Sequence, residues 1–157
     1  MRFQSVHHAA RNPSAEVVYR PKEYSFDTLP AELRRGFASV LVDDLNLEVD
    51  EGGRVVSVWG MCPHTRWVEA TLAPPSAEPG DLFVLPDHPF VRGISLEVNP
   101  QRYRPTYVDR RLGWVKVSIQ DLSASAVEVL PGMIVEVSDG GKLCSLWLKP
   151  TQGLESP

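Results

Sequence analysis

Apolar and polar residues alternate with a period of two over most of the chain after residue 44. The segment LNLEVD (45–50) alternates in this way, and so does part of RVVSVWGM (54–61). Such alternation is typical of strands with one buried face. The residues DEGG between the two segments favour a tight turn, so we predict a β-hairpin. The same reasoning predicts further strands within 15–19, 68–73, 81–85, 91–98, 106–119, 125–130 and 132–150.

A different period appears in FDTLPAELRRGFASVL (26–41). Leu29, Leu33 and Phe37 recur every four residues, which places them on one face of a helix. Asp27 or Thr28 can cap that helix, and a proline suits its first turn. We therefore predict one short helix near 29–41.

The sequence of the first hairpin recurs near the end of the chain. LEVDEGGRVVSVW (47–59) and VEVSDGGKLCSLW (135–147) are identical at six of thirteen positions, with an offset of 88. The two glycine matches follow from the turn, because glycine reaches positive φ without steric cost. No turn requires the other matches, which include Glu48/Glu136, Ser57/Ser145 and Trp59/Trp147. We predict a duplicated β-hairpin at 45–61 and 133–149.

The repeated tryptophans have two interpretations. They fill equivalent positions in the packing, or they present equivalent surfaces to a partner. The hairpin loop decides between them, because a shift of one residue moves every side chain to the other face. An even loop places Trp59 beside Asn46 on the polar face, and a three-residue loop with a bulge places it among the apolar residues. The sequence leaves both open.

These elements predict a mainly β fold, a single-domain antiparallel barrel or sandwich of about 7–9 strands. We expect an N-terminal arm or edge strand at 1–22, the β domain at 23–150 and a frayed tail at 151–157. A length of 157 residues favours one domain, and fourteen prolines disfavour long helices.

Composition narrows the classes of partner. The net charge of −4 lacks the basic excess typical of nucleic-acid-binding proteins, so we do not expect that partner. No stretch has the roughly 20 apolar residues of a membrane helix, and the first residues lack an apolar leader. Two cysteines, Cys62 and Cys144, favour free thiols in a reducing compartment. We expect a cytoplasmic protein without a membrane partner.

The densest group of reactive side chains is WGMCPHTRW (59–67). Cys62 and His64, with His88 from the segment PDHP, are candidates for a thiolate site or for metal ligands. The close-spaced ligand pairs of structural zinc are absent, and the alternative is a packed loop with a buried cysteine. We therefore predict no cofactor and no metal.

A second cluster is the basic stretch QRYRPTYVDRR (101–111), where Tyr103 and Arg104 stand among further arginines. Arginine and tyrosine are frequent at protein interfaces. A solvated edge with surface ion pairs is the alternative interpretation.

No catalytic motif is present, so we expect a binding module rather than an enzyme. A protein partner is the expected ligand, as for an inhibitor, an immunity-type protein or an accessory subunit. A small β-barrel that binds a small molecule, or an enzyme with a Cys62/His64/His88 site, is the alternative, and a homodimer also remains open. The predicted binding residues are Trp59, His64, Arg66, Trp67, Tyr103, Arg104 and Trp147.

Overall fold

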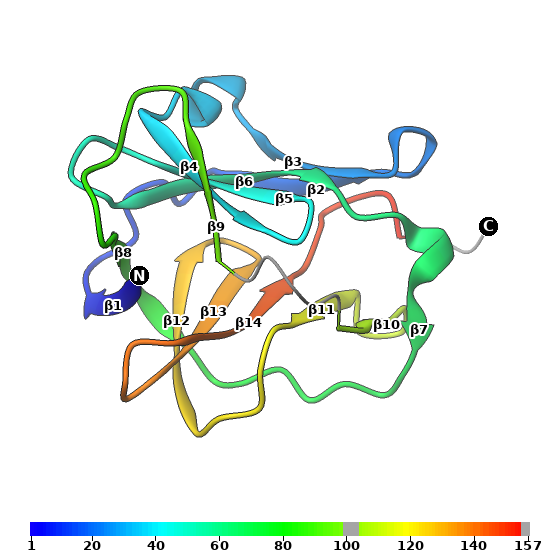
Figure 1. Cartoon of the computed structure of the whole chain (residues 1–157). Helices are drawn as coiled ribbons and strands as arrows, with labels where there is room; N and C mark the ends of the chain where they lie inside the picture. Colours follow the sequence, from blue (N-terminus) through cyan, green and yellow to red (C-terminus); the bar gives the residue numbers. More distant parts are fainter. Residues whose placement is uncertain (99–103, 155–157) are drawn as a thin grey trace.

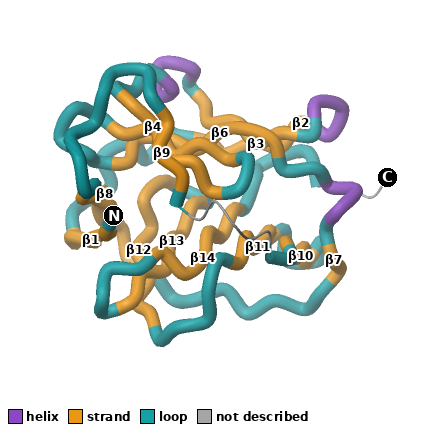
Figure 2. Tube along the Cα trace, viewed as in Figure 1, coloured by secondary structure: helices purple, strands orange, loops and turns teal. Residues whose placement is uncertain are grey.

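The chain folds into two β-sheets that face each other across an apolar core (Figures 1 and 2). The computed structural model describes residues 1–98 and 104–154. The predicted mainly β class is confirmed, and of the two predicted architectures the sandwich is found, because the sheets do not close into a barrel. No helix in these residues is long and apolar enough to cross a membrane.

The first sheet has six strands in the order β2-β3-β6-β5-β4-β9. Its strands are β2 (Glu16–Arg20), β3 (Ser25–Leu29), β4 (Ala38–Val42), β5 (Leu45–Val49), β6 (Val55–Met61) and β9 (Ser95–Glu97). Short 3₁₀ turns lie at η1 (Pro21–Glu23), η2 (Ala31–Arg34) and η3 (His64–Arg66).

The second sheet has eight strands in the order β1-β8-β12-β13-β14-β11-β10-β7. Its strands are β1 (Arg2–His7), β7 (Val68–Glu69), β8 (Glu78–Leu85), β10 (Thr106–Asp109), β11 (Trp114–Ser118), β12 (Ala124–Leu130), β13 (Met133–Ser138) and β14 (Leu143–Leu148). β1 lies at one edge of this sheet. The described residues hold fourteen strands, more than the expected number, because several are only two to five residues long.

The same strand order occurs in both sheets. β2-β3-β6-β5-β4 in one corresponds to β10-β11-β14-β13-β12 in the other, and all neighbours within these two units are antiparallel. A parallel strand then flanks each unit on the same side: β9 lies beside β4, and β8 lies beside β12. The likeness of two hairpins thus extends to two five-strand units.

The segment that follows each repeated hairpin crosses to the opposite sheet. After β6, β7 pairs in parallel with β10. After β14, Thr151 donates its backbone N–H to Val17 O of β2 at 2.9 Å, and Tyr19 N–H donates to Gln152 O at 3.1 Å. Of the tail predicted at 151–157, residues 151 and 152 are thus hydrogen-bonded to β2, and 155–157 lie outside the described residues. Each unit is completed by a segment from the other.

The two hairpins have the same register and the same bulge. Leu47 lies opposite Val58 and Val135 opposite Leu146, while the register shifts after Glu48 and after Glu136. Trp59 lies opposite Asn46, so it takes the polar, outward face even though the bulge is present. The expectation that a bulge would return Trp59 to the apolar set is wrong, because the bulge lies between the turn and Ser57 and leaves the pairing of residues 57–60 unshifted.

A buried carboxylate explains the matches that the turn does not require. Trp59 Nε1 donates to Glu48 Oε1 at 2.8 Å, and Trp147 Nε1 donates to Glu136 Oε1 at 2.6 Å. A buried polar group left unpaired costs about 1–3 kcal/mol, so each glutamate and its tryptophan satisfy each other. The serines differ: Ser145 Oγ donates to Glu136 at 2.6 Å, whereas Ser57 Oγ has no partner among the described residues.

The core lies between the sheets and draws on both hairpins. Their inward residues are Leu45, Leu47, Val49, Val55 and Val58 in the first, and Met133, Val135, Val137, Leu143 and Leu146 in the second. Removing these large apolar side chains from water is the main stabilising contribution to the sandwich.

The predicted helix is reduced to the 3₁₀ turn η2, and Ala38–Val42 is a strand instead. The four-residue spacing was misleading, since Leu33 and Phe37 do pack against the core, but from irregular backbone. Gly36 and the β-branched residues Val40 and Val42 favour the extended pairing of β4 with β5.

Gly36 provides a test of the buried glutamate. A Cβ at this position would collide with Glu48 Oε2 and the Val49 carbonyl. We expect Gly36→Ala to lower the free energy of unfolding by about 1–3 kcal/mol, because the carboxylate has no room to move. Urea denaturation measures this. Gly140→Ala is the matched control, since its nearest contact is Ser138 Oγ at 3.8 Å, and equal stability of the two variants would contradict the account.

Candidate functional site

The segment after β6 is fixed by one buried phenol. Tyr19 Oη donates to Cys62 O at 2.8 Å and accepts from the His64 backbone N–H at 2.9 Å. Burial raises the pKa of Tyr19 to about 12, so the hydroxyl stays a donor at neutral pH. The Trp67 ring lies 4.8 Å from the Tyr19 ring. The loop predicted from WGMCPHTRW is therefore a rigid part of the fold.

This loop lines a cleft of about 140 Å³. The cleft brings together three of the predicted binding residues, Arg66, Trp67 and Arg104. The other lining residues are Asp43, Asp44, Leu45, Met61, Cys62, Pro63, Pro105, Thr106 and Val117. Trp67 lines the cleft together with two arginines and two carboxylates, so it can hold a single apolar side chain that has charged neighbours.

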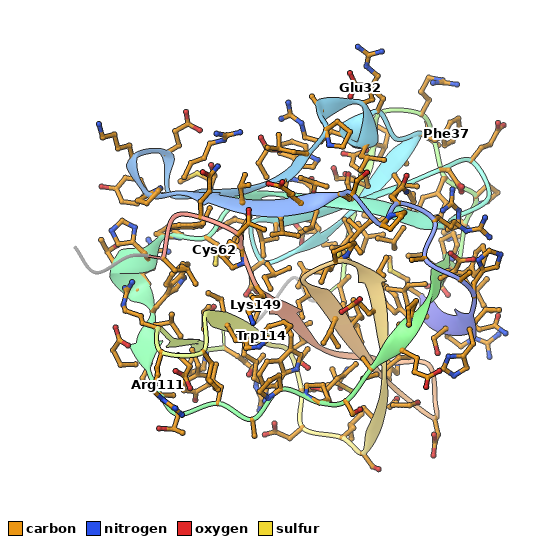
Figure 3. All side chains as sticks on the ribbon, turned by 180° about the vertical axis from the view of Figure 1, so that it is seen from behind. Glu32, Phe37, Cys62, Arg111, Trp114 and Lys149 are labelled. Carbon is orange, nitrogen blue, oxygen red and sulfur yellow. The ribbon has the colours of Figure 1, made fainter. Side chains whose placement is uncertain are left out.

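Cys62 is a buried part of the wall rather than a reactive group. It lies among the side chains between the sheets (Figure 3), and Trp67 Nε1 donates to its Sγ at 3.4 Å. Burial raises the pKa of the Cys62 thiol to about 11. A thiolate is the nucleophilic form, so this environment disfavours nucleophilic catalysis.

His64 and His88 do not meet at this cleft. The His64 ring stacks on Tyr24, with centroids 5.4 Å apart. His88 follows β8, next to Asp87, whose carboxylate pairs with the N-terminal amine at 2.8 Å. In Figure 1 the N-terminus and η3 lie on opposite sides of the molecule. Within residues 1–98 and 104–154, no group of three or more His, Cys, Asp or Glu is placed to hold a metal ion.

Asp43 is the one carboxyl of the cleft that titrates near neutral pH. Burial raises its pKa to about 6, and the neighbouring Asp44 adds to the rise. Its backbone is left-handed, with φ of 52°, a conformation that Asp and Asn adopt more readily than most residues. No local signal pointed to Asp43, because an acidic pair in a turn is common on protein surfaces.

The first repeated tryptophan opens onto a groove on the outer face of the six-stranded sheet. Trp59 is half-buried and shares two adjoining hollows, of about 260 and 370 Å³, with Arg34. Arg35 lines the larger hollow. Met61, which is 52% exposed, lines both the smaller hollow and the cleft. The groove and the cleft therefore share Met61 in their linings.

The second repeated tryptophan is covered. Trp147 is 4% exposed, with the Lys116 ammonium 5.0 Å from its ring centroid and the Trp114 ring 6.2 Å away. Lys149 in turn lies over Trp114 at 5.7 Å (Figure 3). These side chains occupy the outer face of Trp147, so its predicted role in binding a partner does not enter the proposal below. Tyr103 lies outside the described residues.

In a comparison with known proteins, no family model matches the chain, and no curated protein matches it. The site is therefore interpreted from its own geometry.

The burial of both thiols predicts how they react with a thiol reagent. Cys62 and Cys144 are both free and buried, and burial raises the pKa of each. We expect almost no reaction of the native protein with a disulfide reagent near pH 8, and reaction of both thiols in denaturant. Absorbance of the released thiolate measures this. Rapid labelling of native Cys62 would favour the alternative thiolate site.

Asp43 predicts a pH dependence of stability. Its folded pKa of about 6 exceeds the unfolded value, so its contribution is present below about pH 4 and is lost as the pH rises to about 6. We expect Asp43→Asn to raise the free energy of unfolding at pH 7 by on the order of 1 kcal/mol, after allowance for solvent screening, and to have no effect near pH 4. Urea denaturation at both pH values measures this, with Glu51→Gln as the exposed control. If Asp43→Asn raised the free energy of unfolding equally at pH 4 and pH 7, the raised pKa of Asp43 would be contradicted.

Proposed function

We propose that this chain is a binding module that docks onto a protein partner through the docking face, defined as Arg34, Arg35, Trp59, Met61, Arg66, Trp67 and Arg104. The observation that carries the proposal is that the exposed Met61 lines both the Trp59 groove and the cleft, which places the two hollows side by side. Tryptophan, methionine and arginine are the residues enriched at protein interfaces.

The charge of the docking face favours an acidic partner. Within the described residues, the side chains of Arg35 and Arg66 make no hydrogen bond or ion pair. Arg104 approaches only Asp121, at 3.5 Å, and that aspartate side chain is 87% exposed. The chain as a whole carries a charge of −4, so these arginines form a local positive surface. Opposite charge across an interface speeds association and fixes its register.

The size of the cleft favours an anchor side chain over a free ligand. Pockets for drug-sized molecules are about 300–1,000 Å³, whereas the cleft measures about 140 Å³. One apolar side chain of the partner, flanked by carboxylates, matches its Trp67 wall and its arginines. Asp43 and Asp44 also line the cleft, and they would repel acidic groups of a partner that approach them rather than the arginines.

An inhibitor, an immunity-type protein or an accessory subunit would work by such docking alone. Two free, buried cysteines agree with action in a reducing compartment such as the cytoplasm.

Selection from a phage-displayed random peptide library tests the docking face. We expect enriched peptides to carry Asp or Glu around an aromatic or aliphatic residue. The double variant Arg35→Glu with Arg66→Glu should weaken their binding at least about tenfold, because it places like charges across the interface. Biolayer interferometry measures the affinity.

The matched control is Arg2→Glu with Arg111→Glu, which changes charge equally at exposed positions outside the docking face. Enriched peptides without acidic residues, or equal binding to both double variants, would contradict the proposal. Sedimentation tests whether the docking face instead binds a second copy of this chain. If the wild-type protein is a dimer and the docking-face variant is a monomer, the occupant is a second copy rather than an acidic partner.

A further inference from the structure

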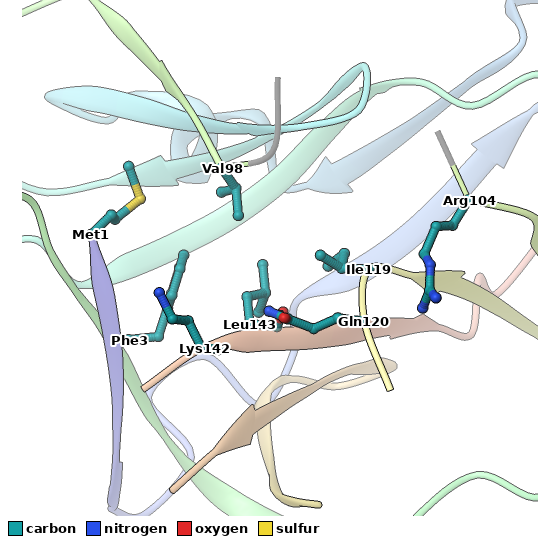
Figure 4. A pocket seen from close by; sticks show the side chains of 8 residues that line it. All are labelled: Met1, Phe3, Val98, Arg104, Ile119, Gln120, Lys142 and Leu143. Carbon is teal, nitrogen blue, oxygen red and sulfur yellow. The ribbon is translucent and has the colours of Figure 1, made fainter. Parts of the chain in front are cut away.

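A second cavity lies between the two sheets, separate from the Trp59 groove. It has a volume of about 370 Å³, which falls within the range of small-molecule sites. In Figure 4, Val98 and Met1 lie on one side and the side chains of the eight-stranded sheet on the other. The lining residues are Met1, Phe3, Val98, Arg104, Ile119, Gln120, Lys142 and Leu143.

The floor of this cavity is the hydrophobic core itself. Phe3, Ile119 and Leu143 all belong to the buried core cluster, and their side chains face the hollow in Figure 4. An apolar ligand body on this floor would leave water for a preformed apolar surface, which is favourable. The floor therefore selects a ligand with a hydrocarbon part.

The rim of the cavity is cationic, and the repeated hairpin shows why. Lys142 occupies the position of Arg54, whose guanidinium pairs with Asp50 at 3.3 Å. In the second hairpin Ser138 takes the place of Asp50: it still caps the turn, accepting from the Lys142 backbone N–H at 3.0 Å, but carries no charge. No ion pair engages the Lys142 ammonium in the part of the chain that the structure describes. Arg104 lies on the far side of Gln120 (Figure 4), where its guanidinium pairs with Asp121 at 3.5 Å, so Lys142 is the rim cation without an ion pair among the described residues.

We infer that this cavity binds a small organic anion, a carboxylate with an apolar body. The carboxylate pairs with Lys142, and the body lies on Phe3, Ile119 and Leu143. Gln120 lies between Lys142 and Arg104 (Figure 4), and its Nε2 donates to Leu143 O at 2.9 Å, so its amide is engaged by the backbone of the floor. The site is independent of the proposed protein partner, apart from the shared Arg104.

Three probes test separately whether binding requires the negative charge and the apolar tail of the ligand. Decanoate carries both, decylamine has the same tail with a positive head, and acetate has the head without the tail. We expect saturable binding of decanoate by calorimetry, with chemical-shift changes at the Ile119 and Leu143 methyl groups. Decylamine and acetate should bind at least about tenfold more weakly, because each lacks one of the two contacts.

Lys142→Gln tests the head-group contact, and it is not expected to disturb folding because the side chain is exposed. We expect it to weaken decanoate binding about tenfold, since a charge-assisted hydrogen bond is lost. Lys22→Gln, an exposed lysine in η1, should leave the affinity unchanged. Equal affinity for decanoate and decylamine, an unaltered affinity in Lys142→Gln, or no binding of decanoate would overturn the inference.

Discussion

The pairing of a glutamate with a tryptophan N–H determines how each half of this sandwich is built, with Glu48 buried and Glu136 half-buried. A carboxylate that leaves water must find donors, and the outward face of a hairpin offers few. The indole across the strand supplies one in both hairpins, at 2.8 Å to Glu48 and 2.6 Å to Glu136. The tryptophan must then lie on the outer face, which leaves the opposite face of the same strands entirely apolar for the core.

The surroundings of the glutamate–tryptophan pair differ between the two hairpins. Around Glu136, Ser145 adds a second donor, and Lys116 and Trp114 close over Trp147. Around Glu48, the Gly36 backbone supplies the additional donor, and the outer side of Trp59 stays open beside Arg34. One hairpin is thus completed internally, while its counterpart keeps an open aromatic surface beside arginines.

Several features could be predicted from the sequence because they depend on local pattern. The alternation of residues 45–61 indicated the hairpin, and the matched Glu, Ser and Trp positions indicated a contact beyond the turn. The wider likeness of the two five-strand units was not predictable, since SFDTL of β3 and WVKVS of β11 share no residue position by position. β3 and β11 are related only by the way their backbones pair with neighbouring strands, and many different sequences can form such pairing.

The candidate site was predicted in part for the same reason. Arg66, Trp67 and Arg104 stood out as interface residue types, and the fold brings them to one cleft. Asp43, Met61 and Arg35 gave no local signal, because their role depends on which strands become neighbours. The covering of Trp147 was not predictable either, because Lys116 and Trp114 come from an adjacent strand about thirty positions away.

The crossing segments have a consequence for the integrity of the molecule. β7 completes the sheet of the second unit, and residues 151–152 complete that of the first. Either unit in isolation would lose a neighbour along its first strand and expose unpaired backbone groups, a template for unwanted association. A single cut in the loop between β7 and β8 would accordingly yield two fragments that need each other, held together as interlocked halves without a covalent link.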